Sequence, residues 1–242
     1  NNIRILNPKG KISNYSGYKK GKWWVQDIAA QIPCKILINS VSKNAKVIDL
    51  CAAPGGKTAQ LISYGVEVTA VEKNLKRTRI LSNNLKRLGL KAKIVNKDAN
   101  SWKPKTLADA VLIDAPCSST GTIRKNPDIP WRLNSSEEAF NSKMKLLNKE
   151  QDKLLISGSK MIDINGILIY SVCSLEPEEG KNLIKNFINK NTEFKIIPIR
   201  PNEIDIPNKA ITQEGFIQTF PFLYSSKGGM DGFFIARLMK SH

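Results

Sequence analysis

The sequence contains a single histidine, His242, which is its last residue. Sites in which a histidine activates a serine or cysteine need that ring beside the nucleophile, and many zinc centres need several imidazoles. We therefore exclude both classes and expect any nucleophile here to be activated by other groups. No apolar run reaches the roughly 18 residues of a membrane span, and no segment reads as a signal peptide. We predict a cytoplasmic protein with no membrane partner.

Acidic residues and cysteines are also scarce. Lys and Arg number 38 against 21 Asp and Glu, a formal net charge of +17. Such an excess favours a polyanionic partner such as nucleic acid, although a bias toward Lys, Asn and Ile throughout a genome would give the same composition. The four cysteines are widely spaced, without a Cys-x-x-Cys pair, so we predict reduced thiols: Cys34, Cys51, Cys117 and Cys173.

Apolar, β-branched segments alternate with amphipathic segments along most of the chain. This alternation predicts an α/β fold with a mostly parallel, doubly wound sheet. Residues 1–44 do not follow it, so we divide the chain into a small N-terminal appendage (1–44) and an α/β domain (45–242). The predicted strands are 46–53, 67–73, 91–98, 109–116, 166–174, 194–199 and 232–238. One predicted helix starts near Lys57, and three others cover 75–90, 136–163 and 176–190.

The first strand leads into the turn "CAAPGGKT" (51–58). It is not a phosphate-binding P-loop, because Cys51 stands where that motif needs glycine, nor is it Gly-x-Gly-x-x-Gly. Gly55 and Gly56 still allow a ligand close to the backbone and leave helix amides free for a carboxylate. Ligands of such sheets bind at the carboxyl ends of the strands, where Glu72 suits a ribose diol and Asp98 an adenine amino group. Carboxylate, ribose and adenine together describe S-adenosylmethionine.

Two further strands end in a cysteine. "DAPCSSTG" (114–121) places Cys117 after one nearly apolar strand, and "YSVCSLEPEEG" (170–180) places Cys173 after the next. Because both thiols belong to the same edge of the predicted sheet, we expect them to serve one site. Cys51 is expected to pack beside the cofactor and Cys34 to lie in the core.

These segments, with "VIDLCAAPGGKT", "TIRKNPDIPW", "GGMDGFF" and the early "GKWWVQD", resemble the RsmB/Nop2/Sun family of RNA cytosine-5 methyltransferases. The likeness covers almost the whole chain and is greatest to the bacterial RsmB (Sun, Fmu) branch, which modifies small-subunit (16S) ribosomal RNA. It implies a Rossmann-like class I methyltransferase fold, with residues 1–44 a remnant of the RNA-binding lead-in region. Val172 stands where the family usually has threonine. Members of this branch also carry an N-terminal helical RNA-binding domain that these residues do not match, so we expect weak unaided RNA affinity.

The resemblance implies methyl transfer from S-adenosylmethionine to carbon 5 of a cytosine in RNA, leaving S-adenosylhomocysteine. Cys173 matches the family's nucleophile, which attacks carbon 6 and so activates carbon 5. A base must then remove the carbon 5 proton, and without a histidine we assign that role to Cys117. We expect the carboxyl of Asp114 at ring nitrogen 3. The implied cofactor residues are Cys51, Ala52, Ala53, Pro54, Gly55, Gly56, Lys57, Glu72, Asp98 and Asp114.

The loop after Cys117 is basic, and we expect Arg124 and Lys125 to meet RNA phosphates and Trp131 either to stack on a base or to pin the loop. Alternatives stay open: a tRNA or another RNA as substrate, a DNA-type enzyme that attacks with Cys117, or a non-catalytic RNA-binding scaffold. Three strand-end cysteines could also hold a metal, but we expect none. We expect a monomer.

Overall fold

The computed structural model describes residues 9–133 and 136–241. In this part of the chain eight strands form one sheet in the order β3-β2-β1-β4-β5-β8-β6, and β7 also pairs with β8. Strands β1 to β5 are parallel, while β8 runs antiparallel to its neighbours. The predicted mostly parallel sheet is confirmed. The strands are β1 (Lys46–Leu50), β2 (Glu67–Val71), β3 (Lys93–Val95), β4 (Ala108–Asp114), β5 (Ile162–Val172), β6 (Phe194–Ile196), β7 (Ile217–Gln218) and β8 (Phe234–Lys240).

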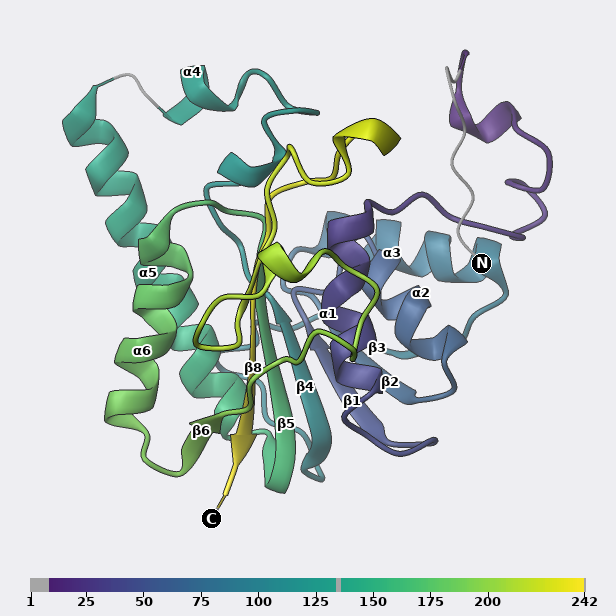
Figure 1. Ribbon diagram of the computed structural model, residues 1–242. Coiled ribbons are helices and arrows are strands. Elements are labelled where there is room, and N and C mark those ends of the chain that lie inside the picture. Colours follow the sequence, from purple (N-terminus) through teal and green to yellow (C-terminus); the bar gives the residue numbers. More distant parts are fainter. Residues whose placement is uncertain (1–8, 134–135, 242) are drawn as a thin grey trace.

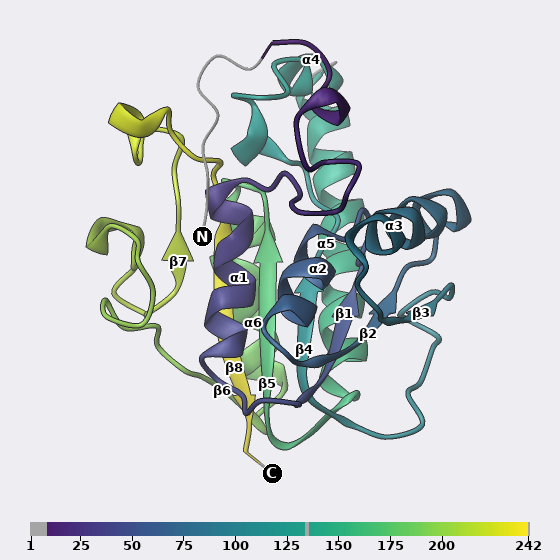
Figure 2. The same ribbon diagram turned by 90° about the vertical axis from the view of Figure 1, so that its right-hand side faces the viewer.

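Helices cover both faces of the sheet (Figures 1 and 2). Along each central strand, successive apolar side chains point to opposite faces, as a pleated strand requires. Val47 and Leu112 thus belong to the core under α1 (Ile28–Ile38), whereas Ile48 and Ile113 belong to the core under α5 (Glu137–Ser159). The first face carries α1 (Ile28–Ile38), α2 (Gly56–Ser63) and α3 (Leu75–Leu88), the second α5 (Glu137–Ser159) and α6 (Lys181–Lys190), and the short α4 (Ile129–Leu133) lies beyond the sheet.

Most predicted elements end a few residues earlier than expected, and one predicted helix is broken. Strand β1 stops at Leu50 because Cys51 adopts a left-handed conformation with φ of 59°. The predicted helix 136–163 ends at Ser159, and β5 already begins at Ile162. The predicted helix 176–190 is divided at Gly180, where a Cβ would lie 2.8 Å from the Phe234 ring.

Helix α1 lies within the segment that we set apart as an appendage. Its residues Ala29, Ile32 and Cys34 are buried in the same cluster as Val47 of β1. The predicted core position of Cys34 is confirmed, and burial raises the pKa of its thiol well above the ordinary value. A domain boundary at residue 44 stays a prediction. No helix in the described ranges is both long and apolar enough to cross a membrane.

Candidate active site

Two neighbouring parallel strands carry the two cysteines to one place. Asp114 at the end of β4 pairs in register with Ser171 near the end of β5, so Cys117 and Cys173 follow side by side. Their Sγ atoms lie 3.4 Å apart, and both thiols are free. Ser119 completes the group, with its Oγ 3.5 Å from the Cys173 Sγ.

The two thiols share protons unequally. A hydrogen bond from Cys117 lowers the pKa of Cys173 below the ordinary value, against the effect of burial, and the Ser119 hydroxyl and the charge of Lys57 add to this lowering. The same bond, together with burial, raises the pKa of Cys117 well above the ordinary value. When the pair loses one proton, the negative charge therefore resides on Cys173. Because the thiolate is the reactive form, this arrangement favours Cys173 over Cys117 as a nucleophile, and the role of attacker stays a prediction.

A buried carboxylate fixes the loop that carries Cys117. Glu179 is fully buried and accepts hydrogen bonds from the Ser118 backbone amide and from Gln151 Nε2, both at 2.9 Å from its Oε1. The Gln151 amide also donates to the Pro116 carbonyl at 2.9 Å. Sequence reasoning missed Ser119, Gln151 and Glu179 as parts of the site. The only signal in the sequence was that Ser119 and Glu179 lie inside the two cysteine motifs. Their contacts could not be foreseen, because the partners lie far away in the chain.

Lys57 and Asp114 form a charged pair beside the thiols. The Lys57 Nζ lies 2.8 Å from Asp114 Oδ2 and 5.3 Å from the centre of the Phe233 ring. Burial works to lower the pKa of Lys57, but the Asp114 carboxylate raises it, so the group stays an ammonium ion. The Ser171 hydroxyl donates to the other Asp114 oxygen at 3.1 Å. Asp114 is thus oriented by β5 and by the glycine turn together.

The glycine turn bends sharply between β1 and α2. Gly55 has a φ of 101°, and a Cβ there would lie 2.7 Å from Leu81 Cδ1 of α3, so the position requires glycine. Asn84 of α3 donates to the Pro54 carbonyl at 2.8 Å. Burial raises the pKa of Cys51 to about 12, so this thiol is not a nucleophile.

Two acids on the next strand ends suit a nucleoside. Glu72 is 3% exposed; its Oε1 accepts from the Asn74 amide at 2.9 Å, and Arg77 Nη1 lies 3.5 Å from its Oε2. That Oε2 has no hydrogen-bond partner among the residues that the structure describes. Buried polar atoms are normally paired, so a hydroxyl of a bound ligand fits this oxygen. Asp98 is exposed after β3, and its Oδ1 accepts from the Asn100 amide at 2.9 Å.

Comparison with known proteins decides the family. The family model described as 16S rRNA methyltransferase RsmB/F matches residues 36–239. The chain belongs to the RsmB/F family. The resemblance inferred from the motifs is thereby confirmed, and so is the Rossmann-like class I fold.

Curated proteins and solved structures match nearly the whole chain. The ribosomal RNA small subunit methyltransferase B of Photorhabdus laumondii is 33% identical over 98% of this chain and 51% of its own length. The chain spans about half the length of the curated relatives it matches. The crystal structure of PH0851 is 32% identical, with a TM-score of 0.81 over 96% of this chain and 50% of its own. That of NSun6 from Pyrococcus horikoshii with SFG is 26% identical, with a TM-score of 0.76 over 97% and 57%.

The cations of the basic loop after Cys117 form ion pairs within the protein. Arg124 and Lys125 both pair with the carboxylates of Asp27 and Asp231, at 2.6–3.0 Å. This four-residue cluster ties the loop to the start of α1 and to the turn before β8. RNA contact by the two cations remains a prediction. Trp131 is 80% exposed, so its ring is open to a partner.

Asp49 is a further buried acid, one residue before the end of β1. It is fully buried, and burial raises its pKa to about 7. The Thr58 hydroxyl donates to its Oδ2 at 2.6 Å, while Oδ1 has no hydrogen-bond partner within residues 9–133 and 136–241. Over the same residues, no group of three or more His, Cys, Asp or Glu is arranged to hold a metal ion.

Proposed function

We propose that this chain transfers a methyl group from S-adenosylmethionine to carbon 5 of a cytosine in small-subunit (16S) ribosomal RNA. Membership of the RsmB/F family supports the reaction class and the substrate. The observation that carries the proposal is the pair of thiols 3.4 Å apart, one with a lowered and one with a raised pKa. One site then holds both a nucleophile and a second sulfur able to exchange a proton.

The cysteine that attacks is Cys173. Carbon 5 of cytosine is a poor nucleophile, and addition of the Cys173 thiolate to carbon 6 makes the ring an enamine that is reactive at carbon 5. The electron pair of the former double bond moves toward ring nitrogen 3. Asp114 faces that nitrogen in the proposal, and the Lys57 ammonium 2.8 Å from its carboxylate is a source of the proton that the ring takes up.

Release requires a base, and the proposal gives that role to Cys117. In the resting site its proton is retained partly by the hydrogen bond to Cys173. Once the Cys173 sulfur is bonded to carbon 6 it no longer carries the charge that accepts this bond. The pKa of Cys117 then falls, so this thiol can give its proton to water after the adduct has formed. Its thiolate takes the proton from carbon 5, the electrons of that bond restore the double bond between carbons 5 and 6, and the electron pair of the carbon 6–sulfur bond returns to Cys173, which leaves as the thiolate. Ring nitrogen 3 returns its proton to the pair of Lys57 and Asp114.

The methyl donor S-adenosylmethionine supplies an electrophilic methyl group. We propose that Glu72 holds its ribose through Oε2, which accepts no hydrogen bond from a described residue, and that Asp98 holds its adenine. The helix amides after Gly55 would face its carboxylate, and Cys51 would pack beside it. The full set proposed for this cofactor is Cys51, Ala52, Ala53, Pro54, Gly55, Gly56, Lys57, Glu72, Asp98 and Asp114.

The RNA is proposed to approach over α4, where Trp131 is exposed and can stack on a base. Contacts by Arg124 and Lys125 to phosphates require these cations to be shared with Asp27 and Asp231. We propose further that the protein works as a monomer, without a metal, in the cytoplasm, and that residues 1–44 are a remnant of the RNA-binding lead-in region.

The test is methyl transfer from tritiated S-adenosylmethionine to purified 16S ribosomal RNA, followed by digestion to nucleosides. We expect labelled 5-methylcytidine with the natural protein and none with Cys173→Ala. Label in transfer RNA alone would contradict the proposed target, and a protein that binds RNA without any transfer would favour the scaffold. Bisulfite mapping of ribosomal RNA from a strain lacking the gene would then locate the nucleotide.

A further inference from the structure

We propose that the chain has a second RNA-binding site, at the edge of the sheet opposite the thiols, which holds the phosphodiester backbone of the same RNA. The site is a pocket of about 450 Å³ over strands β1 to β3, and we call it the basic pocket. It is defined by the side chains of Lys46, Lys91, Lys93, Lys105 and Trp102. The inference rests on the proposed function, because it takes RNA as the substrate.

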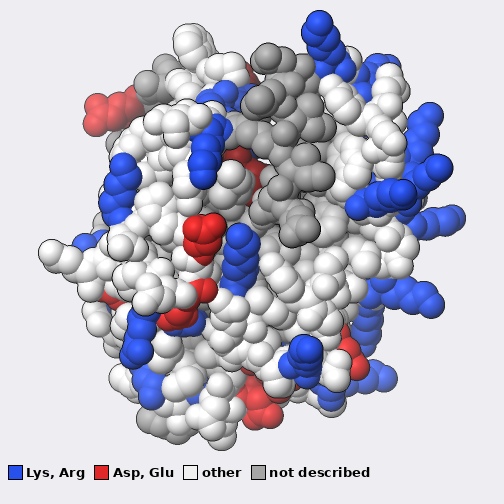
Figure 3. All heavy atoms as spheres, turned by 45° about the vertical axis from the view of Figure 1, so that its right-hand side comes forward, with Lys and Arg blue, Asp and Glu red and all other residues white. Residues whose placement is uncertain are grey.

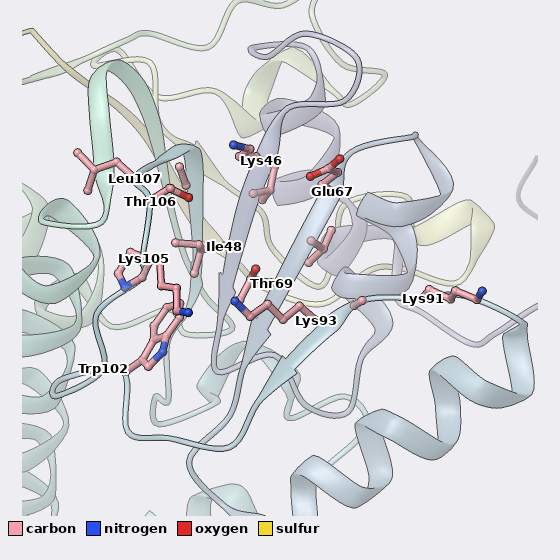
Figure 4. A pocket seen from close by; sticks show the side chains of 15 residues that line it. Lys46, Ile48, Glu67, Thr69, Lys91, Lys93, Trp102, Lys105, Thr106 and Leu107 are labelled. Atoms are coloured by element: carbon pink, nitrogen blue, oxygen red, sulfur yellow. The ribbon is translucent and has the colours of Figure 1, made fainter.

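The basic pocket exists because one connection contains no helix. Residues 96–107 link β3 to β4 as a loop, so the face of β1 and β2 that would otherwise be covered is open. Trp102 of this loop forms one wall, and Lys105 lies beside it (Figure 4). Lys93 extends across the floor from β3, close to Thr69 of β2.

Position separates the basic pocket from the catalytic site. Lys46 and Lys93 are the first residues of β1 and β3, whereas Cys117 and Cys173 follow the last residues of β4 and β5. These strands are parallel, so the pocket and the thiols lie at opposite ends of them. The seven residues of β4 span roughly 20 Å at about 3.3 Å per residue. One mononucleotide cannot reach both sites, whereas a folded RNA can.

The charge of the basic pocket is unpaired. All four lysines are exposed, and none forms a side-chain hydrogen bond or ion pair with another described residue. Glu67 is the one acid that lines the pocket. The segment that supplies most of these lysines is strongly basic, because residues 73–107 contain eleven Lys and Arg but only one acid, Asp98. Figure 3 shows Lys and Arg gathered toward the side of the molecule where α3 lies.

Lysines around a partly exposed tryptophan fit RNA in particular. Phosphates attract the ammonium groups and release counterions, while an aromatic ring offers a base a stacking surface. Trp102 is half-buried against the core under α5, so its orientation is maintained while part of the ring remains accessible. The basic pocket therefore supplies both elements that single-stranded RNA requires.

The test compares two triple variants that each remove three exposed positive charges. Lys91→Gln/Lys93→Gln/Lys105→Gln alters the basic pocket. Lys160→Gln/Lys190→Gln/Lys195→Gln alters the region of α5, α6 and β6, where the three lysines are also exposed and also unpaired among described residues. Binding of a 16S ribosomal RNA fragment is measured at several salt concentrations, with methyl transfer to that fragment and to a short cytosine-containing oligonucleotide.

We expect the pocket variant to bind the fragment more weakly. The slope of the logarithm of the binding constant against the logarithm of the salt concentration should flatten by about two units, near 0.7 for each lost contact to a single strand. The control variant should behave as the natural protein, and both should methylate the oligonucleotide at the natural rate. Equal slopes for the two variants, with transfer intact in the natural protein, would overturn the second site alone. Absence of transfer by the natural protein would overturn the proposed function. A third outcome is that the natural protein binds adenosine monophosphate and the pocket variant does not, while both bind RNA equally well. This would indicate a small-ligand site and contradict the proposal.

Discussion

The unequal sharing of protons between Cys117 and Cys173 can be tested through Ser119. Its hydroxyl lies 3.5 Å from the Cys173 sulfur and lowers the pKa of that thiol. A hydrogen bond to a charged group contributes about 1.5–3 kcal/mol, and one pKa unit corresponds to about 1.4 kcal/mol. The distance is long for a hydroxyl, so we take the lower limit and expect Ser119→Ala to raise the pKa of Cys173 by about one unit.

Backbone strain must be separated from loss of the hydroxyl. Ser119 has a φ of 63°, in the left-handed region, where alanine is strained and glycine is not. Ser119→Ala keeps the Cβ that strains this backbone and Ser119→Gly removes it, while both remove the same hydroxyl. If the hydroxyl is the cause, both raise the pKa of Cys173 equally.

The assay is the rate of alkylation by iodoacetamide as a function of pH, followed at each cysteine by mass spectrometry. Ser225→Ala, an exposed serine in a different turn, is the control and should leave the rates unchanged. Cys117→Ala should raise the pKa of Cys173 more than either Ser119 variant, because the bond from Cys117 is the largest cause of its lowering. Faster alkylation of Cys117 than of Cys173, or no shift in Cys117→Ala, would refute the reasoning.

Three more predictions concern buried carboxylates. Glu179→Gln replaces a carboxylate oxygen, which accepts hydrogen bonds, by an NH2 group that donates them. It should lower the free energy of unfolding in urea by about 1–3 kcal/mol; an unchanged value would remove its role in holding the Cys117 loop. Glu72→Ala should weaken S-adenosylmethionine binding by about 1–3 kcal/mol in calorimetry, and equal affinity would remove the ribose assignment. The pKa of Asp49 is about 7 when folded and about 3.9 when unfolded. The folded state therefore holds the proton more strongly, and stability falls as pH rises. Relative to the non-titrating Asp49→Asn, the natural protein should lose up to about 4 kcal/mol between about pH 4 and pH 7; parallel stability curves would contradict the shift.

Strands and strand-end residues could be predicted because their signals are local. An apolar run such as that of β4 predicts a buried strand, and the parallel order predicts that the residues after β4 and β5 meet at one edge. Cys117, Cys173 and Asp114 lie together there for this reason. The ends of the elements were less predictable: β1 stops where Cys51 turns left-handed, which no neighbouring residue signals.

Contacts between distant segments could not be predicted. Glu179 meets Ser118 across 61 residues, and Asp27 meets the Asp231 amide across 204. The pairing of Arg124 with two acids likewise depends on the folded path of α1 and of the turn before β8. Helix α1 was missed because the alternation of strands and helices begins only after it. The helix is buried because it packs on one face of β4 and β5, and that face exists only once the sheet has assembled.

The measurement that tests the account most directly is denaturing electrophoresis of each cysteine variant with labelled RNA and S-adenosylmethionine. Cys117→Ala should attack, more slowly than the natural protein, transfer the methyl group and then stall as a covalent adduct. A general base contributes about 10²–10⁴-fold to such a step, so the adduct should survive the gel. Cys173→Ala should show neither adduct nor transfer. An adduct with Cys173→Ala and none with Cys117→Ala would mean that Cys117 attacks, and would contradict the roles that the two pKa shifts assign.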